Sequence, residues 1–362
     1  MPSSAWTYWE YLAVYGWLRT LAAAVVAVTV SAGDGTRHPR PQGSPRPVLS
    51  TCTLLDYRAC IRLYVAPRIG HLPIQAVRPS TITKLYRDLL TSGGRDGQLL
   101  AVATVTHLHA VLRKAFRDAV IVDELIASNP VERAKRPRTQ AQEPGTVWTM
   151  AQLRTFLATA KQHRLFAFFH VAAYTGARRG EFLNLRWTDV DLEAKKITIT
   201  GSTAVIGGER VNGTTKSGRT RVVTIEDETV AVLRLRKADQ AAEQLQAGDS
   251  WRGTNDGYVF ATGWGEPIYP DTVTSLMTKL IRAHNQPGSQ DSGLTDQLPH
   301  ARLHDLRHLH ATTLLLSGVP VHVVAARLGH ADPAITLRVY AHVIRSAEAA
   351  AADIFAQAVR AT

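Results

Sequence analysis

The sequence predicts a mainly α-helical protein with a small antiparallel β-sheet, built as a helical domain followed by a mixed α/β domain. Apolar residues recur at helical spacing through most of the chain. Apolar residues alternate with threonine, as is typical of strands, at residues 197–200, and residues 222–225 form a second strand-like stretch. A length of 362 residues is enough for two domains plus an extension.

The charge and cysteine content narrow the function classes. A formal net charge of +12 indicates a polyanionic partner, the alternative being a basic protein that binds nothing in particular. The two cysteines, Cys52 and Cys60, exclude a disulfide framework and a cysteine-based zinc module. Their scarcity fits a reducing compartment, so we expect a cytoplasmic protein.

Residues 1–46 form an N-terminal extension of unclear structure. Residues 20–33 are uncharged and rich in alanine and valine, like the core of a signal peptide, but the run is short for a membrane span. The aromatic residues and Glu10 before it are untypical of a signal peptide. An apolar helix packed on the rest of the chain, or a wrongly chosen start site, is the favoured interpretation.

Residues 47–136 are expected to form a small helical domain with basic faces. Its three helical segments lie around residues 54–65, 82–90 and 105–116. Basic faces are usually only solvated, but their repetition on successive helices favours contact with a DNA backbone. The residues assigned to that contact are Arg58, Arg62, Arg113, Lys114, Arg117, Lys135 and Arg136.

A linker at residues 137–146 leads into the mixed domain, residues 147–345. Thr149 and Gln152 predict a capping box, and the apolar run 165–174 predicts a buried helix. After a turn come Arg178 and Glu181, three residues apart. They are either a surface ion pair of little consequence or a buried arginine held by a carboxylate so that it can bind phosphate oxygens.

Strands are expected at residues 197–200 and 222–225, with a glycine-punctuated hairpin region between them. Lys216 lies in this hairpin region. A lysine there is most often plain solvated charge, but on a mobile hairpin it could also protonate a leaving oxygen as a general acid. Helical segments at 231–245 and 270–283 follow.

The C-terminal part gathers polar side chains that do not look like core residues. His304 and Arg307 share one face of a predicted helix, and His330 follows a second helix, 321–328, that ends at Gly329. The next helix carries Tyr340. A hydroxyl nucleophile beside cationic and proton-transferring groups is suited to attack on a phosphodiester. Residues 346–362 predict an alanine-rich tail helix.

The order of these motifs resembles the tyrosine recombinases, or phage-type integrases, over about residues 47–345. The motifs are Thr-Gly-x-Arg-x-x-Glu, Thr-Lys-Ser, His-x-Leu-Arg-His, Leu-Gly-His and a tyrosine ten residues later. The resemblance implies a helical core-binding (SAM-like) domain and a mixed α/β catalytic domain that clamp DNA. It further implies a site-specific recombinase that integrates or excises a phage or another mobile element through a 3′-phosphotyrosyl intermediate.

The resemblance also implies partners and roles. The partners are double-stranded attachment sites, three further copies in a homotetramer on DNA, and accessory DNA-bending or excision proteins; no metal or other cofactor and no membrane are expected. When bound to DNA the protein would be associated with the nucleoid. Residues 1–46 do not look like an arm-binding domain. By resemblance the catalytic residues are Arg178, Lys216, His304, Arg307, His330 and Tyr340, with Glu181 in support.

The roles form a consistent chemistry. Arg178, Arg307 and His330 would neutralise charge on the non-bridging oxygens, and His304 is the candidate base for the tyrosine.

Three alternatives remain open at this point. His304 and His308 have the i,i+4 spacing of metal ligands, although no glutamate follows the first histidine and no cysteine cluster completes a site. The helices from 303 to 330 also resemble a helix-turn-helix, as in a non-catalytic DNA-binding protein. A type IB topoisomerase shares the chemistry, and relaxation of supercoils without site preference would identify it.

Overall fold

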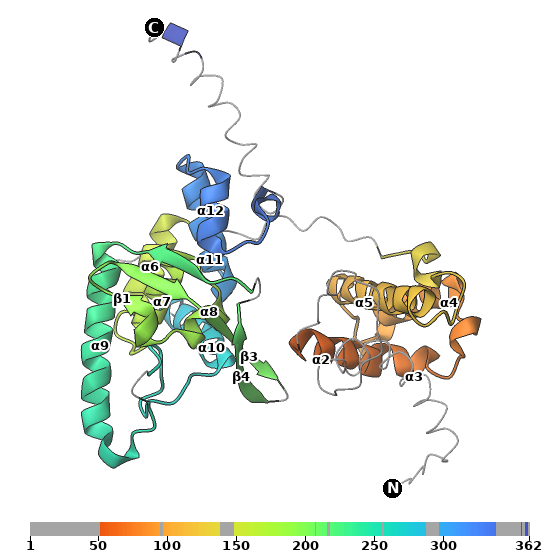
Figure 1. Ribbon diagram of the computed structural model, residues 1–362, viewed down its shortest axis with the longest axis horizontal. Coiled ribbons are helices and arrows are strands. Elements are labelled where there is room, and N and C mark those ends of the chain that lie inside the picture. The colour runs from red at the N-terminus through yellow and green to blue at the C-terminus, as the bar shows by residue number, and fades with distance from the viewer. Residues whose placement is uncertain are drawn as a thin grey trace, which may run out of the picture. The chain divides into compact units, whose positions relative to one another are not determined.

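The computed structural model describes residues 51–94, 97–137, 148–206, 208–215, 218–254, 257–286, 297–337, 356 and 359–360. The chain divides into two compact units, Met1–Glu143 and Pro144–Thr362 (Figure 1). The predictions made for residues 1–46, for Lys216, for Tyr340, and for most of the linker and of the tail lie outside the described residues.

The first unit is all-helical over its described residues. Two helices supply most of its core, with their apolar residues at three- and four-residue spacing. In chain order its elements are α2 (Thr51–Cys60), the π-helical turn η2 (Ile61–Val65), α3 (Ala66–Ile69), η3 (Ile74–Ala76), α4 (Pro79–Ser92), α5 (Val102–Ile121) and η5 (Pro130–Arg133).

The first helical stretch passes through Pro67 instead of ending there. Pro67 lies in the first turn of α3, where a missing backbone N–H is tolerated, and the π-helical turn η2 ends just before this helix, so the chain leaves the helix only at Gly70. The helical segment expected around residues 54–65 therefore extends to Ile69.

The second unit combines helices with two small antiparallel sheets. Its helical elements are α6 (Met150–Ala160), α7 (Phe166–Thr175), α8 (Arg179–Asn184), η6 (Trp187–Asp189), α9 (Asp227–Ala247), η7 (Gly248–Ser250), α10 (Pro270–His284), α11 (Leu303–Leu316) and α12 (Val321–Leu328). Its strands are β1 (Val190–Asp191), β2 (Lys196–Ile199), β3 (Gly201–Ile206), β4 (Glu209–Thr214) and β5 (Arg221–Thr224).

The strands are arranged differently from the single hairpin region that the sequence predicts. β2 pairs directly with β5, with Ile197 opposite Val223, and β1 completes a three-stranded sheet in the order β1-β2-β5. The residues between β2 and β5 include a separate hairpin, β3–β4 (Figure 1). All residues of β4 except Val211 are glycine, charged or polar, so its strand character does not stand out in the sequence.

The core of the second unit is built around aromatic rings. Phe168 contacts Phe169, Phe182 and Phe260 edge to face at centroid distances of 5.5, 5.9 and 5.3 Å.

The predicted capping box at Thr149 is present, with the Thr149 hydroxyl accepting from the backbone N–H of Gln152. Leu316, the last residue of α11, is 59% exposed. None of the helices among the described residues is both long and apolar enough to cross a membrane.

Candidate active site

Arg178 is placed by the sharp junction between α7 and α8. Helix α7 ends at Gly176, whose φ of +63° is the left-handed conformation that favours glycine. Arg178 is then the N-cap of α8, and the Glu181 carboxylate accepts from its backbone N–H at 2.8 Å and from its guanidinium at 3.0 Å. The choice between surface pair and buried pair is thereby decided, because the Glu181 side chain is fully buried.

Glu181 has a second arginine partner that the sequence analysis missed. Arg221, the first residue of β5, donates to both carboxylate oxygens at 3.0 and 2.7 Å. Burial opposes ionisation of Glu181, but the hydrogen bonds and charge of Arg221, together with Arg178, lower its pKa. The available signal was strand periodicity, since Arg221 lies two residues before the buried Val223 and thus on the same face of β5.

Arg307 lies on α11 and is buried, with 3% of its surface exposed. Its side chain contacts the turn after α7 and the turn at the end of α12. It donates to the carbonyl of Gly176 at 2.7 Å, to the carbonyl of Leu328 at 2.8 Å and to Nε2 of His330 at 2.9 Å. Arg178 reaches the adjacent carbonyl of Gly329 at 3.4 Å. Both guanidinium groups therefore converge on the turn that ends α12.

His330 is a neutral imidazole in this arrangement. Its Nε2 accepts from Arg307, so its Nδ1 carries the proton and donates to the Thr336 hydroxyl at 2.7 Å. Burial and the positive charges of Arg307, Arg178 and Arg221 lower the pKa of His330 to about 4. His330 is therefore uncharged at neutral pH in this arrangement, and its Nε2 is engaged by Arg307.

His304 lies on the exposed side of the first turn of α11, three residues before Arg307. The surrounding protein desolvates the ring, and His308, Arg307 and Arg178 add positive charge nearby, which lowers the pKa of His304 to about 4. Its ring meets that of His308 edge to face at 4.8 Å. At neutral pH His304 is uncharged, the state that a proton acceptor must have.

Arg179, the residue after Arg178, contacts α10 and not the cluster formed by Arg178, Glu181 and Arg307. It donates to the Thr274 hydroxyl at 2.7 Å and to the carbonyl of Pro270 at 3.3 Å, both on α10. Of the two consecutive arginines, Arg178 alone joins the cluster with Glu181.

Two of the predicted catalytic residues, Lys216 and Tyr340, lie outside the described residues. On either side of Lys216 the backbone N–H of Gly218 donates to the carbonyl of Thr215 at 2.8 Å, and the Thr215 hydroxyl donates to the carbonyl of Arg219. Tyr340 follows the last described residue of its segment, Leu337, by three positions.

The basic residues assigned to DNA contact belong to the first unit. All of them are exposed except Lys114, which is partly buried and pairs with Asp118 at 2.8 Å. Arg113 pairs with Glu132 at 3.5 Å. They are Arg58, Arg62, Arg113, Lys114, Arg117, Lys135 and Arg136.

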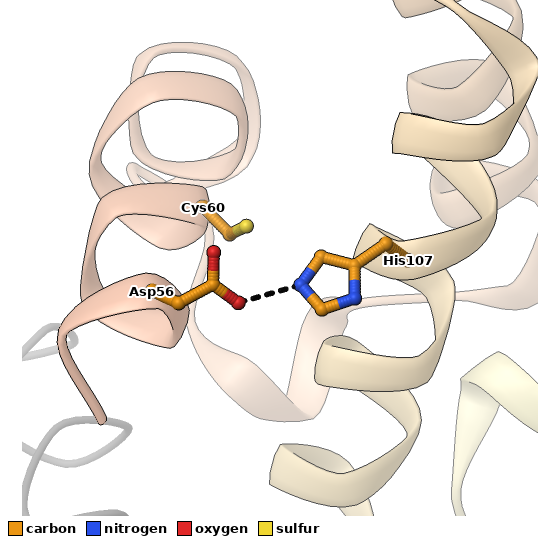
Figure 2. A group of neighbouring side chains, drawn as sticks. All are labelled: Asp56, Cys60 and His107. Carbon is orange, nitrogen blue, oxygen red and sulfur yellow. Dashed lines mark hydrogen bonds and ion pairs between the residues drawn. The ribbon is translucent and has the colours of Figure 1, made fainter. Parts of the chain in front are cut away.

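The suspected metal ligands His304 and His308 do not belong to a group of metal-binding side chains among the described residues. Among the described residues, the side chains that lie close enough together to share a metal ion are those of Asp56, Cys60 and His107, between α2 and α5 (Figure 2). Asp56 and His107 already pair at 2.7 Å, and burial followed by the charge of Asp56 raises the pKa of Cys60 to about 11. We interpret this group as packing of α2 on α5.

Comparison with known proteins decides the family. Residues 147–346 match the model of the phage integrase family, which is more than half of the chain. The chain belongs to this family. This integrase is 28% identical over 312 residues to a XerC-like tyrosine recombinase of Caldanaerobacter subterraneus, covering 81% of the chain and 74% of the relative. It is also 28% identical over 286 residues to the ICEBs1 integrase of Bacillus subtilis, covering 77% and 71%.

Solved structures agree in fold with this integrase. The Tn1549 transposon integrase bound to transposon right end DNA superposes with a TM-score of 0.73 at 18% identity, covering 93% of this chain and 99% of that one. A lambda integrase tetramer bound to a Holliday junction gives 0.60 at 15% identity, covering 90% and 76%. The predicted fold class is confirmed. The protein is a tyrosine-type site-specific recombinase, an enzyme of DNA strand exchange, which supersedes the helix-turn-helix and topoisomerase alternatives.

Proposed function

We propose that this recombinase cuts and rejoins double-stranded attachment sites with Tyr340 as the nucleophile. Its oxygen forms the bond to phosphorus and makes a 3′-phosphotyrosyl link, while the 5′ oxygen leaves as a hydroxyl. Attack of a 5′-hydroxyl from the partner duplex reverses the step, so the energy of the phosphodiester is retained. No metal or other cofactor takes part in this scheme.

The observation that carries the proposal is the convergence of two guanidinium groups on one turn. Arg178 comes from the α7–α8 junction and Arg307 from α11, and both reach the Leu328–Gly329 carbonyls. Negative charge on the non-bridging phosphate oxygens rises in the transition state, and two forked cations fixed in advance stabilise it. The chain leads from this turn to Tyr340 within eleven residues of Gly329.

The neutral histidines have separate roles in this proposal. His304, exposed beside Arg307, accepts the tyrosine proton, and His330 holds the Arg307 guanidinium in orientation. Lys216 delivers the proton to the departing 5′ oxygen. Glu181 fixes Arg178 through a buried ion pair.

We further propose that four copies act together on DNA. Each recombination joins two duplexes with two cleavages apiece, so four nucleophiles are needed. The DNA-bound Tn1549 integrase and the lambda integrase tetramer support this arrangement. In the first unit, the exposed arginines and lysines would neutralise backbone phosphates and make binding weaken as salt rises. Relatives from integrative and transposable elements support a mobile-element origin.

The assignment of the nucleophile is tested with Tyr340→Phe on a nicked suicide substrate. The variant lacks only the hydroxyl, so covalent attachment should vanish while DNA binding stays nearly unchanged, measured by denaturing gel and by band shift. A covalent complex formed by Tyr340→Phe would refute the assignment.

A further inference from the structure

We propose that Arg221 is a positioning residue that keeps the Arg178 guanidinium available to the DNA phosphate. The inference rests on the phosphate-binding role proposed for Arg178. Arg221 itself does not bind DNA in this proposal, because its side chain is only 10% exposed and its donors are engaged within the protein.

All three nitrogens of the Arg221 guanidinium group donate hydrogen bonds within the protein. Its two amino groups donate to the two oxygens of Glu181 at 3.0 and 2.7 Å. Its Nε donates to the carbonyl of Arg327 at 3.0 Å. A forked ion pair plus a backbone acceptor is the geometry that arginine supplies and lysine does not.

The charge count at Glu181 explains why a second arginine is needed. If Arg178 were the sole partner of this buried carboxylate, its fork would close on both oxygens and the pair would be neutral. Arg221 instead occupies both oxygens, and the Arg178 guanidinium keeps one bond, at 3.0 Å. The other amino group of Arg178 makes only a long contact of 3.4 Å to the Gly329 carbonyl. One carboxylate shared by two guanidinium groups leaves one net positive charge, on the side of Arg178.

Arg221 also fixes the turn on which both site arginines converge. A Cβ built on Gly329 would lie 2.6 Å from a terminal nitrogen of Arg221, so the guanidinium lies directly against this turn. The bond to the Arg327 carbonyl joins β5 to the last turn of α12. The neighbouring carbonyls, of Leu328 and Gly329, are those that accept from Arg307 and Arg178.

The second unit contains a matched control with the same contacts. Arg236 donates to both oxygens of Glu243 at 3.1 Å, and its Nε donates to the carbonyl of Val259 at 3.2 Å. Glu243 is likewise shared with a second arginine, Arg164, at 2.9 Å. The Arg236 side chain is 2% exposed, against 10% for Arg221, but Arg236 belongs to α9, and none of these bonds involves a site residue.

The experiment measures single-turnover cleavage of suicide substrates that carry either a phosphodiester or a methylphosphonate at the scissile position. The methyl group removes the negative charge that the arginines neutralise. Arg221→Met should slow phosphodiester cleavage by about 100-fold, as misplacement of a catalytic group does. On the methylphosphonate, the ratio of the wild-type cleavage rate to the variant cleavage rate should be smaller than on the phosphodiester, for Arg221→Met and for Arg178→Met alike. Arg236→Met should cleave both substrates at the wild-type rate per folded molecule.

The outcomes separate this proposal from the proposed function. If the methylphosphonate reduces this rate ratio for Arg178→Met but not for Arg221→Met, the positioning role of Arg221 is wrong. If the methylphosphonate reduces the rate ratio for neither variant, the proposed binding of the phosphate by Arg178 is wrong, and the proposed function is contradicted before the role of Arg221 is reached. If Arg221→Met does not fold, as judged by circular dichroism and DNA binding, Arg221→Lys replaces it. That variant keeps the charge but loses the fork, and an unimpaired Arg221→Lys on the phosphodiester would overturn the proposal.

Discussion

At the scale of single residues, the site distinguishes two consecutive arginines that look alike in the sequence. Arg178 is bound to the buried Glu181, and Arg179 is bound to Thr274 and Pro270 on α10. A spacing of three residues was enough to predict that Arg178 pairs with Glu181. The spacing could not reveal that the carboxylate is shared with Arg221, which is forty residues away in the chain.

This difference gives a paired prediction. Arg178→Lys keeps the charge but loses the fork, so it should reduce cleavage by roughly 100-fold while DNA binding falls far less. Arg179→Lys should cleave at close to the wild-type rate. Single-turnover cleavage and band-shift titrations measure the two effects. Slow cleavage by Arg179→Lys together with a normal rate for Arg178→Lys would show that Arg179, and not Arg178, is the catalytic arginine.

At the scale of elements, the helices and the strands around residues 197–200 and 222–225 were predictable, and the β3–β4 hairpin was not. The helix that ends at Gly329, the buried helix before Gly176 and the capping box at Thr149 follow from local apolar spacing and capping residues. The β3–β4 hairpin did not, because its strands are short and partly glycine and polar. Arg307 and His330 could be placed on one helix and one turn, but the bond between them depends on packing of α11 against α12.

A partly buried histidine, His310, links α11 to two other segments. His310 Nε2 accepts from Arg327 at 3.0 Å, so its Nδ1–H donates to the carbonyl of Ala173 on α7 at 3.0 Å. Burial, then the charge of Arg327, lowers the pKa of His310 to about 4 from an ordinary value of 6.5. Between these values the unfolded chain binds a proton that the folded protein does not, so acidification favours unfolding.

The free energy of unfolding of the second unit should therefore fall as pH decreases from about 7 to about 4, with up to about 3 kcal/mol of that loss due to His310. His310→Gln preserves one acceptor and one donor but does not titrate, so its pH dependence should be flatter. Hydrogen exchange of the α7 and α11 amides at several pH values measures this unit alone. His322→Gln, on the exposed side of α12, is the control and should keep the wild-type slope. Equal slopes for His310→Gln and wild type would contradict the assignment.

At the scale of the whole molecule, charge and motif order predicted the family and the fold class. The domain boundaries 47–136 and 147–345 stay a prediction, as does the core-binding role of the first unit. Assembly is the least accessible property, because a contact between copies leaves no periodic pattern in one sequence. The predicted tail helix offers Phe355 and Val359 on one face, with Ile354 at its edge, and Val359 is 62% exposed within one chain.

We expect a monomer in free solution and tetramers only on paired sites. Deletion of residues 347–362 should leave binding to a single site intact and impair synapsis and strand exchange, because an alanine-rich helix of this length needs a docking surface. Band shifts on one site and recombination between two sites measure the two activities. Full recombination by the truncated protein would exclude docking of the tail on a neighbouring copy, and the chemistry would be unaffected.

The close approach of Arg221 to Gly329 has a consequence for how this site can vary during evolution. The guanidinium occupies the space that any side chain at position 329 would need. The φ of +69° at Gly329 adds a backbone cost for other residues. The two positions are therefore expected to change together: a relative with a side chain at the position of Gly329 should carry a shorter residue at the position of Arg221. In such a relative a different cation would have to balance the glutamate.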